Sequence, residues 1–215
     1  MAWIYILKRI RNILRQSSAM AALRIGFVSL CLLAVGVMAW KADEPRRQRE
    51  SNQFIEAVEA GDLGQVNELL AGGADVNRPD EFGLTPLIIA SRSGRLPLVR
   101  MLLNHGADVN AQHWYIGSAL SQASLYGSPE VADELLARGA DANVRDHIGN
   151  TPLMLAVAVK QLHIVQALIA AGADVNARDE RGHTALAIAV DANDQPMVQI
   201  LLAAGATSAV ATTVN

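Results

Sequence analysis

The sequence predicts an all-α fold, namely a solenoid of five helix-turn-helix repeats preceded by an apolar N-terminal helix that is either a transmembrane or a signal helix. Three observations support this prediction. The chain is 51% apolar but only 4% aromatic, a composition suited to closely packed small helices. Its C-terminal part repeats every 33 residues, as solenoids do. Its N-terminal part contains an uncharged run that approaches the length of a membrane span.

The N-terminal part divides into three predicted segments. Residues 1–19 have a basic amphipathic pattern, typical of a helix that lies along a membrane surface. Residues 25–40 are uncharged and would span about 24 Å as a helix, short of the roughly 30 Å hydrocarbon core. Extending this helix backwards gives a sufficient length if Arg24 snorkels towards the headgroups. We therefore predict a transmembrane helix at 20–40, followed by a charged, solvated linker at 41–50.

A cleaved secretory signal is the alternative, because a basic region precedes the apolar run, which ends in small residues around Ala39. Orientation follows from the Lys and Arg residues on the two flanks of the run. Five precede it and four follow it: Lys8, Arg9, Arg11, Arg15 and Arg24, then Lys41, Arg46, Arg47 and Arg49. Both interpretations place the repeats outside the cytoplasm. The protein is then a single-pass membrane protein with a periplasmic domain, or a secreted or periplasmic protein after cleavage.

The 33-residue period defines the rest of the chain. The string G-A-D-V-N or a variant of it begins at Gly73, Gly106, Gly139, Gly172 and Gly205. A leucine column and an alanine column keep the same spacing, from Leu87 to Leu186 and from Ala57 to Ala189. Three columns in one register indicate a repeat domain at 51–207 and a tail at 208–215. Its units are predicted at about 51–82, 83–115, 116–148, 149–181 and 182–207.

Each position of the repeat has a physical reason. Thr85 and Thr151 are predicted N-caps followed by Pro, which needs no donor at the first helical position. Asp62, Ser128 and Asp194 are predicted to cap the second helix of their units. The glycine that opens each G-A-D string supplies a left-handed C-cap, and the Asp that follows is a turn former. The first and last units depart from the pattern and are predicted to cap the stack.

The motif Thr85-Pro86-Leu87-Ile88-Ile89-Ala90 and its copy at Thr151–Ala156 resemble the T-P-L-H-x-A motif of ankyrin repeats. The copy at Thr184–Ala189 is less close, and the third unit keeps only Ser118-Ala119-Leu120. No copy keeps the His of the motif. The resemblance implies an ankyrin-repeat protein of bacterial type, membrane-anchored or exported, whose loop tips and first helices form a concave face that binds a protein partner.

Composition and motifs argue against several other functions. Residues 1–50 carry a net charge of +6, so the remainder carries −9, and such an acidic domain repels nucleic acid. No metalloprotease, nucleophile-elbow or phosphate-loop motif is present, so we predict no enzyme, cofactor, metal site or small-molecule substrate. A weaker alternative is a metal site that pairs His113 with His147, or His183 with Asp179.

The positions that vary between units are the candidate binding surface. Four of the five aromatic residues after residue 50 occupy loop tips or the exposed ends of first helices. The predicted partner-binding residues are Glu81, Phe82, Arg92, Trp114, Tyr115, Leu125, Tyr126, His147 and Ile148. Adjacent exposed aromatic residues are typical of binding hot spots. The alternative is that Trp114 and Tyr115 pack onto an adjacent loop or onto the membrane-proximal segment of their own chain. The predicted function is a protein-interaction module or scaffold; the alternatives are a regulator or inhibitor of a target enzyme, or a metal-binding effector.

Overall fold

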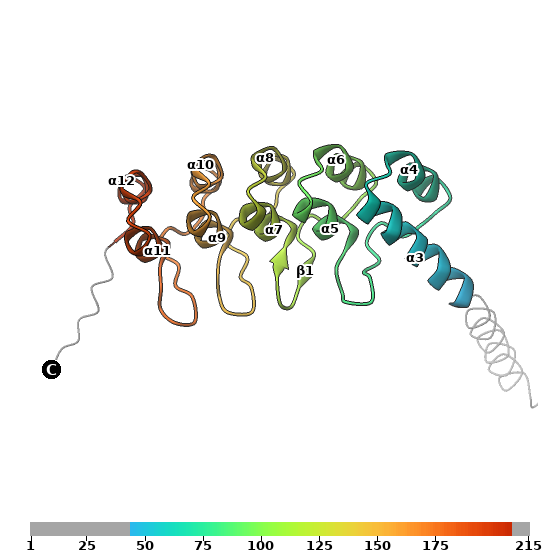
Figure 1. Cartoon of the computed structure of the whole chain (residues 1–215), viewed down its shortest axis with the longest axis horizontal. Helices are drawn as coiled ribbons and strands as arrows, with labels where there is room; N and C mark the ends of the chain where they lie inside the picture. Colours follow the sequence, from blue (N-terminus) through green and yellow to red (C-terminus); the bar gives the residue numbers. More distant parts are fainter. Residues whose placement is uncertain (1–43, 208–215) are drawn as a thin grey trace, which may run out of the picture. The chain divides into compact units, whose positions relative to one another are not determined.

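The computed structural model describes residues 44–207, in which ten helices follow one another as helix-turn-helix pairs (Figure 1). The predicted amphipathic segment, the predicted span at 20–40 and the tail at 208–215 lie outside the described residues. Among the helices from Glu44 onwards, none is both long and apolar enough to cross a membrane.

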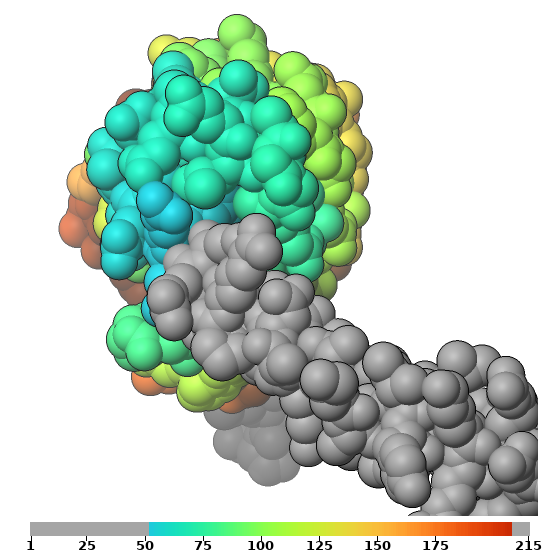
Figure 2. Space-filling model, turned by 90° about the vertical axis from the view of Figure 1, so that its right-hand side faces the viewer, coloured from blue at the N-terminus to red at the C-terminus, as the bar shows by residue number. Residues whose placement is uncertain are grey.

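The first helices of the pairs form one row and the second helices another (Figure 1). The first row consists of α3 (Glu44–Ala60), α5 (Pro86–Arg92), α7 (Ala119–Tyr126), α9 (Pro152–Ala158) and α11 (Ala185–Asp191). The second row consists of α4 (Leu63–Ala71), α6 (Leu96–Asn104), α8 (Pro129–Ala137), α10 (Leu162–Ala170) and α12 (Gln195–Ala203). Figure 2 views this part from the α3–α4 end, so that the later pairs lie behind the first.

Helix α3 begins earlier than the repeat pattern predicts. It starts at Glu44, so residues 44–50 of the predicted linker are helical. The sequence between Glu44 and Glu50 lacks Gly and is rich in Arg, Gln and Glu, which all have high helix propensity. Pro45 stands in the first turn, where a missing N–H leaves no hydrogen bond unmade. The helix propensity of these residues therefore accounts for the extension of α3 on the N-terminal side of residue 51.

The predicted N-caps of the first helices are confirmed. Thr85 Oγ1 accepts a hydrogen bond from the Ile88 N–H at 3.4 Å, and Thr151 does the same with Met154. The third unit replaces Thr by Ser118, which forms a reciprocal capping box with Ser121. The starts of the first helices α5, α7, α9 and α11 are therefore encoded locally, by a hydroxyl three residues before the amide it binds.

The caps of the second helices are confirmed in part. Asp62 and Asp194 accept from the backbone N–H three residues later, at 3.0 and 3.2 Å. Ser128 makes no cap hydrogen bond, so that prediction is wrong. Its hydroxyl instead lies against the preceding unit, where a Cβ on Gly94 would approach Ser128 Oγ to 2.8 Å. Close packing between units has replaced the local cap at this position.

The core consists of the leucine and alanine columns that the period defines. Leu87, Leu120, Leu153 and Leu186 are buried, and so are Ala57, Ala90, Ala123, Ala156 and Ala189. Phe54 takes the first place of the leucine column and is also buried. The methyl groups of the alanine column let successive first helices approach closely, so that α5 packs on α7, α7 on α9 and α9 on α11.

The G-A-D-V-N string joins each unit to the next. Asp108 accepts the Asn110 N–H at 2.9 Å, as predicted for a turn former. Asn110 itself donates from Nδ2 to the Gly139 carbonyl at 3.2 Å and accepts the Asp141 N–H at 2.8 Å. The same pair of bonds recurs at Asn77, Asn143 and Asn176. This asparagine ladder, which the sequence analysis did not predict, holds the loops in register.

The two end units differ in their outer surfaces. The exposed residues of α3 include four polar ones: Asn52, Gln53, Glu56 and Glu59. The last described unit keeps an apolar stacking face, because Val190 is 53% and Leu202 45% exposed. Val157, which stands one period before Val190, is only 2% exposed because the next unit covers it. The fifth unit therefore leaves part of its apolar face exposed, unlike the units before it.

Candidate functional site

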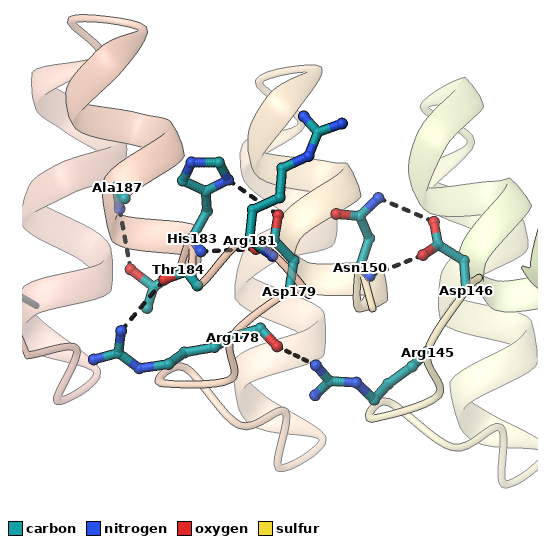
Figure 3. A network of polar contacts seen from close by, with 10 residues as sticks. Arg145, Asp146, Asn150, Arg178, Asp179, Arg181, His183, Thr184 and Ala187 are labelled. Atoms are coloured by element: carbon teal, nitrogen blue, oxygen red, sulfur yellow. Dashed lines mark hydrogen bonds and ion pairs between the residues drawn. The ribbon is translucent and has the colours of Figure 1, made fainter. Parts of the chain in front are cut away.

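Three of the loops that lead into first helices are held by an aspartate. Asp80, Asp146 and Asp179 follow one another at intervals of 66 and 33 residues, and each carboxylate accepts the backbone N–H groups two and four residues later. The donor–acceptor distances lie between 2.7 and 3.0 Å. Figure 3 shows two of these loops, around Asp146 and Asp179. A charged acceptor thus fixes each loop tip from inside.

His113 occupies the same register position in the remaining loop, where it takes over the role of the aspartate. Its Nδ1 accepts the N–H groups of Tyr115 and Ile116 at 3.2 and 3.3 Å. Its Nε2 lies 2.9 Å from the carbonyl oxygen of Phe82 in the preceding loop. Because Nδ1 accepts, the proton of the neutral imidazole is on Nε2, which donates to Phe82. His113 therefore fixes its own loop and ties it to the previous one.

The loop that contains His113 also has a different backbone. Its glycine, Gly117, stands one residue later than Gly83, Gly149 and Gly182 do in their loops. With a φ of 78° at Gly117, strand β1 (Gln112–His113) pairs with β2 (Gly117–Ser118), and His113 faces Gly117 across the hairpin. Within residues 44–207 this is the one strand pair, and it departs from the purely helical prediction. The hairpin presents Trp114, Tyr115 and Ile116 at its tip.

Four rings form a contiguous aromatic row across two loops, made of His113, Trp114, Tyr115 and His147. Trp114 meets Tyr115 edge-on with the centroids 5.3 Å apart, and Tyr115 stacks on His147 at 3.7 Å. His147 Nδ1 donates to the Tyr115 carbonyl at 2.6 Å, which fixes the stack. Trp114 is 77% and Tyr115 48% exposed. The aromatic row is thus fixed by the contacts between Tyr115 and His147, while Trp114 and Tyr115 remain exposed to solvent.

The other predicted residues surround the aromatic row or lie apart from it. Phe82 is 71% exposed beside Glu81 in the preceding loop, and Ile148 is half-buried in the following one. Leu125 and Tyr126 are exposed at the opposite end of α7, about 12 Å of helix away from the hairpin. Arg92 is half-buried at the C-terminal end of α5. The structure thus brings Trp114, Tyr115 and His147 into contact and places Leu125 and Tyr126 at a distance.

Two alternatives to a binding surface are packing of the aromatic residues onto a neighbouring loop and a metal site at His113 and His147. Tyr115 does pack onto the neighbouring loop, through His147, whereas Trp114 extends into solvent. Both ring nitrogens of His113 are engaged in hydrogen bonds, so the pairing of His113 with His147 offers no free ligand set. Among residues 44–207, no group of three His, Cys, Asp or Glu side chains is arranged to hold a metal.

Hydrogen bonds also tie the later loops together (Figure 3). The Arg145 guanidinium donates to the Arg178 carbonyl, and Arg178 donates to the Gly182 carbonyl at 3.3 Å. Burial alone would raise the pKa of Asp179, but hydrogen bonds from His183 and Arg181 outweigh it and lower that pKa. The loop around Asp179 therefore rests on a carboxylate that stays ionised in mildly acidic solution.

Sequence reasoning did not identify the particular hydrogen-bonding role of His113 in its loop. The signal is present in the aspartate column, because His113 stands 33 residues after Asp80 and 33 before Asp146. A histidine that replaces a carboxylate in a repeated hydrogen-bonding position has to accept a bond where the carboxylate did.

Comparison with known proteins agrees with this architecture. A family model described as ankyrin repeats (3 copies) matches residues 20–113, 54–146 and 120–211. No curated protein matches the chain significantly. The matched ranges overlap and together cover most of the 215 residues. This match agrees with the repeated Thr-Pro motif, the paired helices and the asparagine ladder. The chain belongs to the ankyrin-repeat family.

Proposed function

We propose that the repeat domain binds a protein partner through its loop tips and the exposed ends of its first helices, with Trp114 as the central anchor. Ankyrin repeats generally serve as protein-protein interaction modules. The observation that carries the proposal is the exposure of Trp114, which is 77% accessible on a hairpin fixed by His113. Trp is among the residues most enriched at the centres of binding surfaces, so an exposed Trp on a fixed hairpin favours this role.

The rigidity of the aromatic row supports this role. Tyr115 is stacked on His147 and contacts the edge of Trp114, so its ring has little freedom left to lose on binding. A surface that is ordered before the partner arrives avoids part of the entropy cost of association. Trp and Tyr are also enriched among the residues that dominate binding energy.

The proposed surface extends from the end of the first unit to the fourth. Phe82 and Glu81 flank the aromatic row on one side and Ile148 on the other. Leu125 and Tyr126, with the exposed Val159 of the next unit, add an apolar edge at the far ends of the first helices. Arg92 completes this edge on α5. A partner that contacts both regions would cross the row of first helices.

A scaffold of this kind is proposed to act outside the cytoplasm, anchored by residues 20–40. The support is the uncharged run and the excess of Lys and Arg before it. A reporter enzyme fused after Asn215 should be active only if it is of a type that works outside the cytoplasm. Activity of a cytoplasmic-type reporter at that position would overturn the topology, and sequencing the N-terminus of the mature protein distinguishes an anchor from a cleaved signal.

Capture from native membranes tests the interaction itself. Full-length bait is compared with a Trp114→Ala variant, and the captured protein is then titrated against both. Truncation of a central aromatic anchor should weaken binding by about 2 kcal/mol or more, which is roughly a thirtyfold increase in Kd. Melting temperature should barely change, because Trp114 buries little surface within its own chain.

The matched control is Leu202→Ala, which removes an exposed apolar side chain from α12, outside the proposed surface. It should leave the captured partner and its Kd unchanged. A Trp114→Ala protein that melts earlier yet binds at full affinity would show that the residue has a packing role, and the proposal would fail.

A further inference from the structure

The five histidines of the chain all lie in the described residues, and the ring nitrogens of four of them form hydrogen bonds to oxygen atoms alone. Two of these donate to backbone carbonyls, His105 to Met101 and His147 to Tyr115. The other two pair with carboxylates, His163 with Asp133 and His183 with Asp179. An imidazolium donates from both nitrogens, so protonation preserves all four bonds and strengthens the two that reach carboxylates.

His113 is arranged in the opposite way. Its Nδ1 accepts two backbone N–H groups, from Tyr115 and Ile116, while Nε2 already donates to Phe82. A proton added to Nδ1 would point at two other N–H donors, leaving all three without an acceptor. The hairpin would lose both bonds that hold its tip and gain a repulsion in their place. The closed hairpin therefore requires neutral His113.

We propose that acidification opens the hairpin at 112–118 and thereby dismantles the aromatic row, so that partner binding is switched off as the pH falls. The loss of binding rests on the function proposed above, whereas the opening of the hairpin does not. The direction follows from linkage. The open hairpin lets His113 take up a proton and the closed one does not, so each fall in pH favours the open form.

The charged groups around His113 do not reverse this direction. The preceding loop contributes Asp80 and Glu81, and the following loop contributes Asp146 and His147. Asp80 and Asp146 already accept two backbone N–H groups each, and Glu81 is exposed, so water screens its attraction for an imidazolium. Among the described residues, no ion pair joins His113 to any carboxylate, in contrast to His163 and His183.

Hydrogen exchange of single amides tests the opening on the full-length chain without a partner. The Tyr115 and Ile116 amides report on the hairpin, and the Arg181 and His183 amides, which Asp179 holds, provide the control. Exchange is measured from about pH 8 to about pH 5.5, a range that brackets the titration of a free imidazole near 6.5. After correction for intrinsic exchange, protection of the first pair should fall, approaching tenfold per pH unit at the acidic end. Protection of the second pair should not fall, because hydrogen bonds keep the pKa of Asp179 low.

The variant His113→Asp supplies a second, independent measurement, since it restores the acceptor that the other three loops use. Tyr115 and Ile116 should then stay protected across the whole pH range. Constant protection of these amides in the wild-type chain would overturn the proposal, and so would an unchanged acid-dependent step in His113→Asp. If the variant hairpin is already open near pH 8, the wild-type profile alone decides. Failure of the Trp114→Ala capture experiment would remove the binding function but leave this profile unaffected.

Discussion

A single backbone position before each second helix shows how neighbouring units constrain one residue. In the first three units it is Gly61, Gly94 and Gly127, and all three have positive φ. A Cβ at Gly61 would lie 2.3 Å from Arg95 Nη1, which donates to the carbonyls of Val58 and Glu59 at the end of α3. Glycine is therefore favoured there by the left-handed backbone, and any side chain would also have to displace the Arg95 guanidinium.

The fourth unit has Lys160 at this position, in a left-handed conformation with φ of 59°. The following unit offers Asp194, whose short side chain turns away to cap α12, so a Cβ is accommodated. A left-handed backbone is still unfavourable for a residue with a Cβ. Lys160→Gly should therefore stabilise the domain by about 0.5 to 1 kcal/mol. Thermal melting measures the effect, with Lys160→Ala as the control that keeps the Cβ. Equal melting temperatures for the two variants would show that the left-handed backbone carries no strain there.

At the scale of helices and loops, the sequence best predicts those features that depend on hydrogen bonds between residues close in the chain. The starts of α5 and α9 and the turn role of Asp108 follow from residues within three positions of each other. The asparagine ladder and the tie from His113 to Phe82 join residues about 30 positions apart, so no local pattern reveals their partners. The one signal of the hairpin in the sequence is that Gly117 stands one residue later than the glycines of the other loops. That shift indicates a hairpin only once the pairing of His113 with Gly117 is known.

The alanine column allows a direct test at the element scale. Ala156 of α9 is fully buried between neighbouring first helices, whereas Ala158 of the same helix is exposed. Ala156→Leu should destabilise the domain by about 1 to 3 kcal/mol, because three extra carbons have no space between the helices. Ala158→Leu adds the same atoms on the solvent side and should leave the melting temperature within a degree or two. A stable Ala156→Leu protein would mean that the register assigned to α9 is wrong.

For the whole repeat domain, stability comes from contacts between adjacent units, since each pair of helices meets only its neighbours in the stack. The first unit presents polar residues outwards, whereas the last described unit leaves Val190 and Leu202 exposed. The stack therefore tolerates one uncovered apolar face. How many interfaces it can lose before it unfolds is a property of the whole domain that single substitutions do not report.

Truncations measure this property. Ending the chain after Asn176 removes α11 and α12, and ending it after Asn143 also removes α9 and α10. The shorter chain uncovers α7 and α8 and breaks the bonds from Asn143 to Gly172 and Asp174. In a stack of nearest-neighbour interfaces, each removed unit deletes one interface, so the melting temperature should fall in two steps and the chain ending at Asn143 should be unstable. Circular dichroism melting of both truncated chains and the full chain checks this. If the chain ending at Asn143 melted with the full chain, the first three units would be stable by themselves, and the cooperative stack would be ruled out.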